Sequence, residues 1–302
     1  MLVATLVMLV AAVPGFAADN QRKLQVGGRE RGYAVHVPPG ATDSRPMPLV
    51  IVLHGGGGSG AGAATQTGFS READRGGFLV AYPDGTDRVR PFLNALGKPG
   101  LLTWNAGGCC GYAMENRVDD VAFLRAMIGE IERGYRVDPK RICATGLSNG
   151  AMMAYRLACE ASDVVAAVGI VAGVVLAPCA PAAPVSVIYI HGSADEYVPV
   201  GGGIGRKSLT RTSYLPVADS LALWAHADGC PADPELGDTA LLVHLRDYRP
   251  CRADAEVAYY LIDGGGHSWP GGERMAAFLD PPSQAIAATP LIWRFFAAHP
   301  KP

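Results

Sequence analysis

The sequence predicts an α/β fold in which a mostly parallel central sheet carries helices on both faces. Short β-branched or apolar runs alternate with helical patterns along the chain, which is the order that parallel strands with crossover helices produce. The chain has 302 residues, of which 49% are hydrophobic and 18% charged, enough to bury a large core. Because no repeat, charge block or low-complexity linker interrupts the pattern, we predict a single domain over residues 24–302.

Strands and helices are expected where the periodicity changes. Strands are expected over 33–37, at an edge, and centrally over 49–53, 78–82, 141–145, 185–190 and 257–262. Helices are expected over 121–131, 151–157, 218–226 and 284–298. Asp119 and Asp120 precede the first of these helices and suit a helix N-terminus. The irregular Gly- and Pro-rich stretch 87–112 is typical of a binding loop.

Residues 1–17 have the form of a signal peptide, since an apolar run is broken by Pro14 and followed by small residues. We expect cleavage after Ala17. The run lacks an opening Lys or Arg, which leaves an incorrectly assigned start or a membrane anchor as alternatives. A bilayer span needs about 20 uninterrupted apolar residues, so Pro14 favours a secreted or periplasmic protein with no stable membrane insertion of the mature chain.

The charge balance constrains the partners. The formal net charge is −2 and no Lys/Arg run is present, so the sequence lacks the basic surface that nucleic acid or an anionic membrane would require. A small or oligomeric neutral substrate fits better. The oligomeric state cannot be predicted from these observations.

Seven cysteines in an exported chain imply disulfides with at least one thiol left over. Cys159 with Cys179, and Cys230 with Cys251, are expected to staple loops. Cys143 lies in a predicted buried strand and is expected to act as a small core hydrophobe. No pair shows C-x-x-C spacing, so no metal site is expected.

The strongest local motif is Gly146-Leu-Ser148-Asn-Gly150, set between a predicted strand and a predicted helix. A nucleophile elbow requires a sharp turn that raises the serine Oγ above the sheet edge, and glycine on either side removes the Cβ atoms that would collide there. G-x-S-x-G alone arises often by chance. The strand-turn-helix setting favours Ser148 as a nucleophile.

A serine nucleophile needs a base, and the base needs an acid to hold its tautomer. Asp195 follows the strand 185–190, and His267 follows the strand 257–262. Loops beyond the carboxyl ends of parallel strands gather at one edge, so the order Ser148, Asp195, His267 predicts a catalytic triad. The other candidates have weaker settings. Asp163 and Asp263 are unfavourably placed in the sequence, since Asp163 follows soon after the elbow helix and Asp263 is too near His267. The remaining candidates are expected to cap a helix (Asp119, Asp120), to order loops (His54, His191) or to be surface or packing residues (His226, His244).

An oxyanion hole is expected from two loops. The glycine run after His54 has the form of the loop that supplies one backbone N–H in such a site, with Gly55 or Gly56 as donor, and the Asn149 N–H would supply the other. Part of the same run, Gly58–Ala63, also satisfies G-x-G-x-x-A, with Asp84 about 20 residues on, as in a dinucleotide site. That alternative leaves the serine, aspartate and histidine loops unexplained, so no cofactor is expected.

Taken together, the motifs of the chain resemble those of the esterase/polyhydroxybutyrate depolymerase family, which includes feruloyl and acetylxylan esterases and has the α/β-hydrolase fold. The resemblance runs from about Gly32 to the C-terminus and rests on the phrases LHGGGGSG, YPDG, TWNAGGCCG, VDDVAFL, TGLSNGAMMAYRLACE, HGSADEYVPV, GGGHSWPGG and ATPLIWRFFAAHP. It implies the same three triad residues, Ser148, Asp195 and His267.

The resemblance also implies roles that the residues alone do not. Trp104, Asn105 and Trp269 would line the substrate pocket, with ordinary packing as the alternative for both tryptophans. Cys109 and Cys110 would form a vicinal disulfide, or one of them would pair with Cys143. The expected activity is hydrolysis, through a serine acyl-enzyme, of feruloyl or acetyl esters of polysaccharides or of hydroxyalkanoate oligomers. A polyhydroxybutyrate depolymerase proper, a serine peptidase and a non-catalytic binding protein for glycan or polyester fragments are the alternatives.

Overall fold

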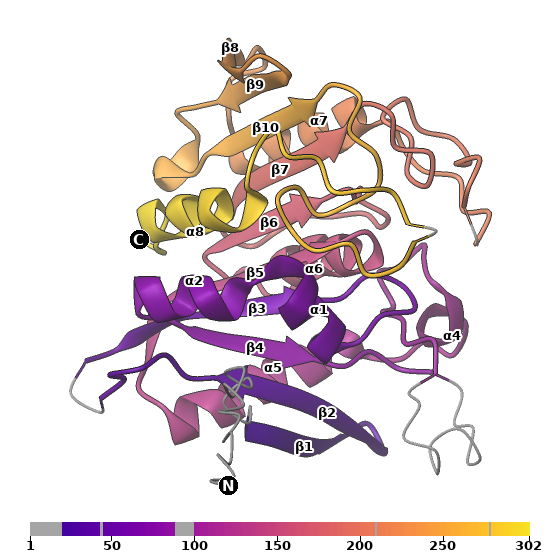
Figure 1. Ribbon diagram of the computed structural model, residues 1–302. Coiled ribbons are helices and arrows are strands. Elements are labelled where there is room, and N and C mark those ends of the chain that lie inside the picture. The colour runs from indigo at the N-terminus through magenta and orange to yellow at the C-terminus, as the bar shows by residue number, and fades with distance from the viewer. Residues whose placement is uncertain (1–19, 43–44, 88–99, 209, 278) are drawn as a thin grey trace, which may run out of the picture.

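A computed structural model describes residues 20–42, 45–87, 100–208, 210–277 and 279–302. The predicted signal segment 1–17 lies outside the described residues. Figure 1 shows one twisted sheet that runs through the molecule from β1 at the bottom to β8 at the top. The spatial order of its strands is β1-β2-β4-β3-β5-β6-β7-β10-β9-β8.

The sheet is parallel in its centre and antiparallel at both ends. The six strands from β4 to β10 in the spatial order run parallel, β1 and β2 are antiparallel on one side, and β9 and β8 are antiparallel on the other. The strands are β1 (Asn20–Val26), β2 (Arg29–His36), β3 (Met47–Leu53), β4 (Leu79–Pro83), β5 (Val137–Leu147), β6 (Ala167–Val171), β7 (Ser186–Gly192), β8 (Glu235–Ala240), β9 (Val243–Tyr248) and β10 (Val257–Ile262).

Helices cover both faces of the sheet, as predicted. α1, α2 and α8 lie in front of it in Figure 1, and α5, α6 and α7 pack on the opposite face. The described helices are α1 (Gly60–Thr67), α2 (Phe69–Gly76), α4 (Gly111–Glu115), α5 (Asp120–Gly134), α6 (Asn149–Glu160), α7 (Val217–Asp228), the 3-10 turn η1 (Arg252–Asp254) and α8 (Ala288–Ala298). None of them is long and apolar enough to cross a bilayer.

The core is divided by the sheet because strand side chains alternate between its faces. On β3, Leu49 and Ile51 pack toward α5 and α6, whereas Val50 and Val52 pack toward α1, α2 and α8. Both faces of this strand are fully buried. That explains why the central strands have continuous apolar sequences rather than alternating ones.

All six predicted strands and all four predicted helices are present, with shifted ends. The expected edge position of the strand over 33–37 was wrong, because β1 pairs with the outer side of β2. The C-terminal helix begins at Ala288 rather than at residue 284. It carries Pro290 in its first turn, where a missing N–H costs nothing. The predictions omitted β1, β6, β8, β9, α1, α2 and α4, most of which are short.

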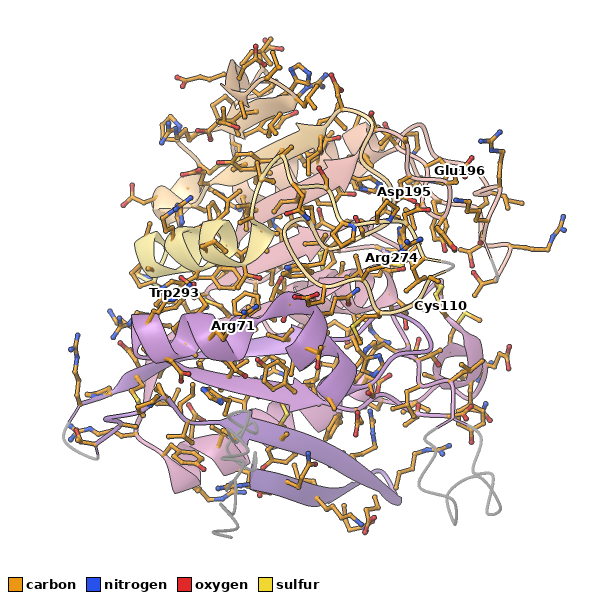
Figure 2. All side chains as sticks on the ribbon, in the orientation of Figure 1. Arg71, Cys110, Asp195, Glu196, Arg274 and Trp293 are labelled. Atoms are coloured by element: carbon orange, nitrogen blue, oxygen red, sulfur yellow. A yellow bond between two sulfur atoms is a disulfide. The ribbon has the colours of Figure 1, made fainter. Side chains whose placement is uncertain are left out.

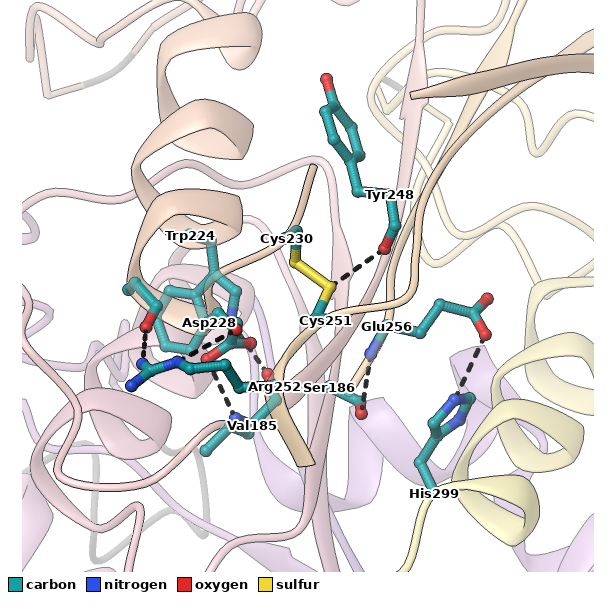
Figure 3. Close-up of a disulfide and its surroundings, with 11 residues drawn as sticks. Val185, Ser186, Trp224, Asp228, Cys230, Tyr248, Cys251, Arg252, Glu256 and His299 are labelled. Atoms are coloured by element: carbon teal, nitrogen blue, oxygen red, sulfur yellow. Dashed lines mark hydrogen bonds and ion pairs between the residues drawn. A yellow bond between two sulfur atoms is a disulfide. The ribbon is translucent and has the colours of Figure 1, made fainter. Parts of the chain in front are cut away.

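The disulfides settle the cysteine predictions. Cys159–Cys179 and Cys230–Cys251 are both formed, as expected, and Cys109 bonds to its neighbour Cys110. Cys143 is free and buried in β5, where burial raises the pKa of its thiol to about 12. Figure 3 shows Cys230–Cys251 tying the end of α7 to the segment before β10.

Candidate active site

Three loops that follow parallel strands bring the predicted chemistry to one edge of the sheet. Ser148 directly follows β5, Asp195 follows β7, and His267 follows β10. Because β5, β6, β7 and β10 are successive parallel neighbours, their carboxyl ends lie on the same side. Figure 2 labels Asp195 and Glu196 on this side, the right of the view. The topology therefore brings the segments that carry Ser148, Asp195 and His267 to the same edge of the sheet.

Ser148 has the backbone of a nucleophile elbow. Its φ of 57° and ψ of −122° lie outside the regions that a non-glycine residue ordinarily occupies, and α6 begins at the next residue. A Cβ on Gly146 would lie 2.6 Å from the Gly150 carbonyl carbon, and a Cβ on Gly150 would overlap Leu53 O. The two glycines are required by this close approach, and Ser148 remains partly exposed at the tip of the turn.

Asp195 and His267 form a buried hydrogen-bonded pair. Nδ1 of His267 lies 2.7 Å from Oδ2 of Asp195, and their side chains are 8% and 0% exposed. The backbone N–H groups of Tyr197 and Val198 donate to Oδ1 at 2.8 and 2.9 Å. Burial acts to raise the pKa of Asp195, but His267 and His191 outweigh it and lower the pKa well below its ordinary value. Asp195 is therefore a carboxylate that holds the His267 hydrogen on Nδ1.

The glycine loop after β3 lies against the elbow. A Cβ on Gly55 would lie 3.8 Å from Ser148 Cβ, and one on Gly56 would lie 3.7 Å from Asn149 Cβ. Asn149 is the first residue of α6, so its N–H belongs to the helix end that lacks intrahelical acceptors. The glycine loop therefore lies next to both Ser148 and the first residue of α6.

His54 holds this loop in shape, the role that the sequence predicted. Its Nε2 accepts a hydrogen bond from the Gly85 N–H at 2.9 Å, which leaves Nδ1 to donate to Gly55 O at 2.8 Å. Burial lowers the pKa of His54, which keeps the ring neutral. His54 therefore supports the glycine loop and is not available as a base.

The burial of Trp104 and Trp269 does not support a role for either in contacting substrate. Trp104 is fully buried and donates from Nε1 to His54 O at 3.0 Å, and the Trp104 backbone exchanges two hydrogen bonds with the Asn149 side chain. Trp269 is 1% exposed and donates to Thr289 Oγ1 at 2.9 Å. Both indole rings are buried in the protein and both N–H groups donate within it, which agrees with the packing alternative.

Asn105 also forms structural hydrogen bonds within the protein. Its backbone N–H donates to Asp120 Oδ2 at 2.7 Å, and its side-chain amide donates to Val118 O at 3.0 Å. Asp120 in turn forms a buried ion pair with Arg31 at 2.7 Å, and Asp119 caps α5 by accepting from Ala122 N at 2.9 Å. Asp119 therefore caps the helix as expected, whereas Asp120 joins the start of α5 to β2 and to the loop that carries Asn105.

Two further acids lie close to the site and were not singled out from the sequence as partners. Asp280 Oδ2 accepts the His267 backbone N–H at 2.9 Å, and Asp280 Oδ1 pairs with Lys207 at 3.0 Å. Lys207 also pairs with Glu196 at 3.0 Å. These side chains line a cavity of about 720 Å³ beside Asp195. No sequence motif marks Asp280, because its partners come from loops distant in the chain.

Comparison with characterised proteins identifies the family. The family model described as esterase PHB depolymerase matches residues 31–202. The chain is 31% identical over 275 residues to the putative esterase NocK of Nocardia uniformis subsp. tsuyamanensis, covering 85% of this chain and 75% of that protein. It is 30% identical over 251 residues to feruloyl esterase B of Piromyces equi, covering 79% of this chain and 42% of that protein, so it spans less than half of the fungal enzyme.

Solved structures agree on the fold. An acetyl xylan esterase from Aspergillus awamori superposes with a TM-score of 0.58 at 16% identity, over 82% of this chain and 94% of that one. A ferulic acid esterase from Anaeromyces mucronatus superposes with a TM-score of 0.55 at 14% identity, over 93% and 90% of the two chains. The fold is therefore that of the α/β-hydrolase esterases. Together with the sequence matches, this shows that the chain belongs to the esterase/PHB depolymerase family.

Proposed function

We propose that this esterase cleaves its substrate by two-step acyl transfer with Ser148 as nucleophile, His267 as base and Asp195 as the acid that orients the base. Nε2 of His267 removes the Ser148 proton while Oγ attacks the ester carbonyl. The protonated His267 then donates that proton to the leaving alcohol, and an acyl-enzyme remains. Water, deprotonated by His267, attacks the acyl-enzyme and restores Ser148.

The oxyanion that forms in each step requires donors already in place. The Asn149 N–H and one N–H of Gly55 or Gly56 would supply them, because the glycine loop lies against the elbow. The single observation that carries the mechanism is the 2.7 Å hydrogen bond between Asp195 and His267 at the edge of the sheet where Ser148 ends β5. No step in this route calls for a metal or an organic cofactor.

The substrate class follows from the relatives. The relatives named feruloyl esterase and acetylxylan esterase support feruloyl or acetyl esters of polysaccharides, and the family description supports hydroxyalkanoate oligomers. Three disulfides suit an oxidising compartment, so we place the enzyme outside the cytoplasm, with residues 1–17 as an export signal. The domain is proposed to run over 24–302.

Substitution of Ser148 by alanine tests the mechanism. Ser148→Ala is expected to lower kcat for p-nitrophenyl butyrate by roughly 10⁶-fold, as removal of a triad nucleophile does elsewhere, and to leave the circular dichroism spectrum unchanged. Ser283→Ala is the matched control, since among the described residues its hydroxyl accepts just the Ala285 N–H, at 3.3 Å. Turnover unchanged in Ser148→Ala would rule out an acyl-enzyme on Ser148, whereas absence of turnover in the unsubstituted enzyme would favour a non-catalytic binding protein.

A substrate panel tests the class. Methyl ferulate, acetylated xylan, 3-hydroxybutyrate oligomers and polyhydroxybutyrate granules are compared by kcat/KM, with an aminoacyl anilide as the amide. We expect the soluble esters to be preferred over the granules and the anilide. Anilide turnover without ester preference would make the protein a peptidase, and a preference for granules would make it a polymer depolymerase.

A further inference from the structure

A second histidine contacts the triad aspartate. His191, on β7, places Nε2 3.3 Å from Oδ2 of Asp195, the same oxygen that accepts from His267. Both side chains in this contact are 0% exposed. The carboxylate thus lies between two imidazole rings, one from its own strand and one from the loop after β10. The acyl-transfer mechanism uses only the second of these rings.

His191 is itself held on both nitrogens. Nε2 donates to Val198 O at 2.8 Å, because a carbonyl oxygen only accepts, and Nδ1 lies 3.0 Å from the Tyr189 hydroxyl. Val198 N in turn donates to Oδ1 of Asp195. His191 therefore contacts one oxygen of the carboxylate and hydrogen-bonds to Val198, the residue whose N–H binds the other carboxylate oxygen.

The same contacts reach the nucleophile elbow. The Tyr189 hydroxyl donates to Gly173 O, and burial raises its pKa well above the ordinary value, so it stays a donor. Gly173 packs under the elbow, since a Cβ there would lie 3.1 Å from Ser148 O. A continuous buried path thus runs from Asp195 through His191 and Tyr189 to the backbone beneath Ser148.

We propose that His191 is a positioning residue for ester hydrolysis, which holds the Asp195 carboxylate at the distance and angle that His267 requires and ties the acid loop, through Tyr189, to the Ser148 elbow. This inference rests on the proposed function. In a triad, an error of about 1 Å in the placement of the base costs about 100-fold in rate. His191 is a second side chain, besides His267, that contacts Oδ2 of the orienting acid.

His191 also sets how strongly Asp195 holds the base. The Nε2–H of His191 donates to Val198 O and also lies 3.3 Å from Oδ2 of Asp195, so loss of this polar group leaves more of the negative charge to the His267 imidazolium. The charged and titratable groups facing this pair are His267 from the loop after β10, Tyr189 on the same strand, and, packed around Tyr189, Tyr155 from α6 and Tyr259 from β10. Burial raises the pKa of all three tyrosines above 10, so below that pH none of them introduces a new charge.

The test compares His191→Phe with His191→Gln by full kinetics on p-nitrophenyl butyrate across pH. Phenylalanine keeps the ring but loses both nitrogens, whereas the glutamine amide can place a donor near the position of Nε2. We expect His191→Phe to lower kcat by about 10-fold to 100-fold with KM little changed, and to move the acid limb of the kcat/KM profile to higher pH. His191→Gln is expected to restore most of the rate and the profile of the unsubstituted enzyme.

Two results would overturn the inference: wild-type kcat and pH profile in His191→Phe, or equal losses in the Phe and Gln variants with an unmoved pH profile, which would mean that only packing matters. Where His191→Phe does not fold by near-UV circular dichroism, His191→Asn replaces it, since asparagine reaches Tyr189 but not Asp195. Unsubstituted enzyme and Ser148→Ala are run in parallel. Absence of turnover in the unsubstituted enzyme would refute the proposed function rather than the role of His191.

Discussion

Asp195 and Asp228 are both buried, yet their surroundings have opposite effects on their charge. Asp195 accepts hydrogen bonds from two backbone N–H groups and contacts two histidines. Asp228, the last residue of α7, accepts from the Val185 N–H at 3.3 Å, and its Oδ2 has no partner among the described residues. The pKa of Asp195 is lowered, whereas burial raises the pKa of Asp228 to about 7.

The difference arises from where the nearest cation points. Arg252 lies beside Asp228, but its guanidinium donates to the backbone carbonyls of Ala227 and Asp228 at the end of α7 (Figure 3). It therefore satisfies the helix terminus and not the carboxylate. Burial alone does not create a charged catalytic group. Near Ser148, backbone N–H groups and His267 donate to the Asp195 carboxylate. At the end of α7, Arg252 donates to helix carbonyls and not to the Asp228 carboxylate.

The largest expected effect comes from removing the charge of Asp195. Asp195→Asn is expected to lower kcat by about 10⁴-fold, because the amide no longer holds the His267 hydrogen on Nδ1 or stabilises the imidazolium. Steady-state kinetics on p-nitrophenyl butyrate measures this. Asp228→Asn is the matched control, with kcat expected to stay within about twofold. Equal losses in the two variants would contradict the comparison and make both acids structural.

A smaller effect concerns stability, and here Asp228 is the sensitive residue. Between about pH 4 and pH 7 the unfolded chain loses the Asp228 proton while the folded chain retains it, so the free energy of unfolding falls as pH rises. Asp228→Asn does not titrate. We compare the difference in Tm between the variant and the unsubstituted protein at two pH values, measured by thermal denaturation. This difference is expected to be more favourable to the variant at pH 8 than at pH 4 by roughly 5 °C.

Asp247 limits how much of the fall in the free energy of unfolding is removed by Asp228→Asn. Burial raises its pKa to about 6, and its Oδ1 has no partner among the described residues. It therefore contributes to the same fall in stability, and only part of the fall is expected to disappear in Asp228→Asn. A pH dependence identical to that of the unsubstituted protein would show that Asp228 is already ionised when folded.

The sequence predicted the parts of the fold whose signals are local. The continuous apolar runs of the central strands and the G-x-S-x-G turn are determined by residues adjacent in the chain, and they placed the six strands and the elbow at Ser148 correctly. β8 and the short β6 were missed. β8 is exposed along its whole length and β6 has only five residues, so neither shows an alternating pattern that stands out from loop sequence.

The sequence was sufficient to propose Asp195 and His267 as partners. It did not reveal the contacts of the residues packed around them. Strand order and loop position sufficed to bring Asp195 and His267 together. His191 was expected to order its loop, but its contact with Asp195 depends on the turn of the intervening residues, which no spacing reveals. The family resemblance implied that Trp104 lines the substrate pocket, with packing as the alternative, and the structure agrees with packing. The burial of Trp104 depends on the hydrogen bonds to His54 and Asn149, which come from two other loops.

The smallest expected effect involves Asp280, which pairs with an exposed lysine. Lys207 pairs with Asp280 and Glu196 but is 43% exposed, so water and salt screen the pairs. Lys207→Met keeps the apolar stem. It is expected to change the free energy of unfolding by less than about 1 kcal/mol and kcat/KM by about threefold or less, with both differences vanishing at about 1 M NaCl.

Two further variants distinguish the effect of the Asp280 charge from the effect of its hydrogen bond to the His267 backbone. Asp280 Oδ2 accepts the His267 N–H, and Asp280→Asn retains an oxygen that can accept it, so this variant is expected to resemble Lys207→Met. Asp280→Ala removes the acceptor and is expected to lower kcat/KM further, because the loop that carries His267 loses an anchor. If Lys207→Met instead lowers kcat/KM tenfold or more, independently of salt, this exposed ion pair is as important for catalysis as the buried hydrogen bonds to Asp195.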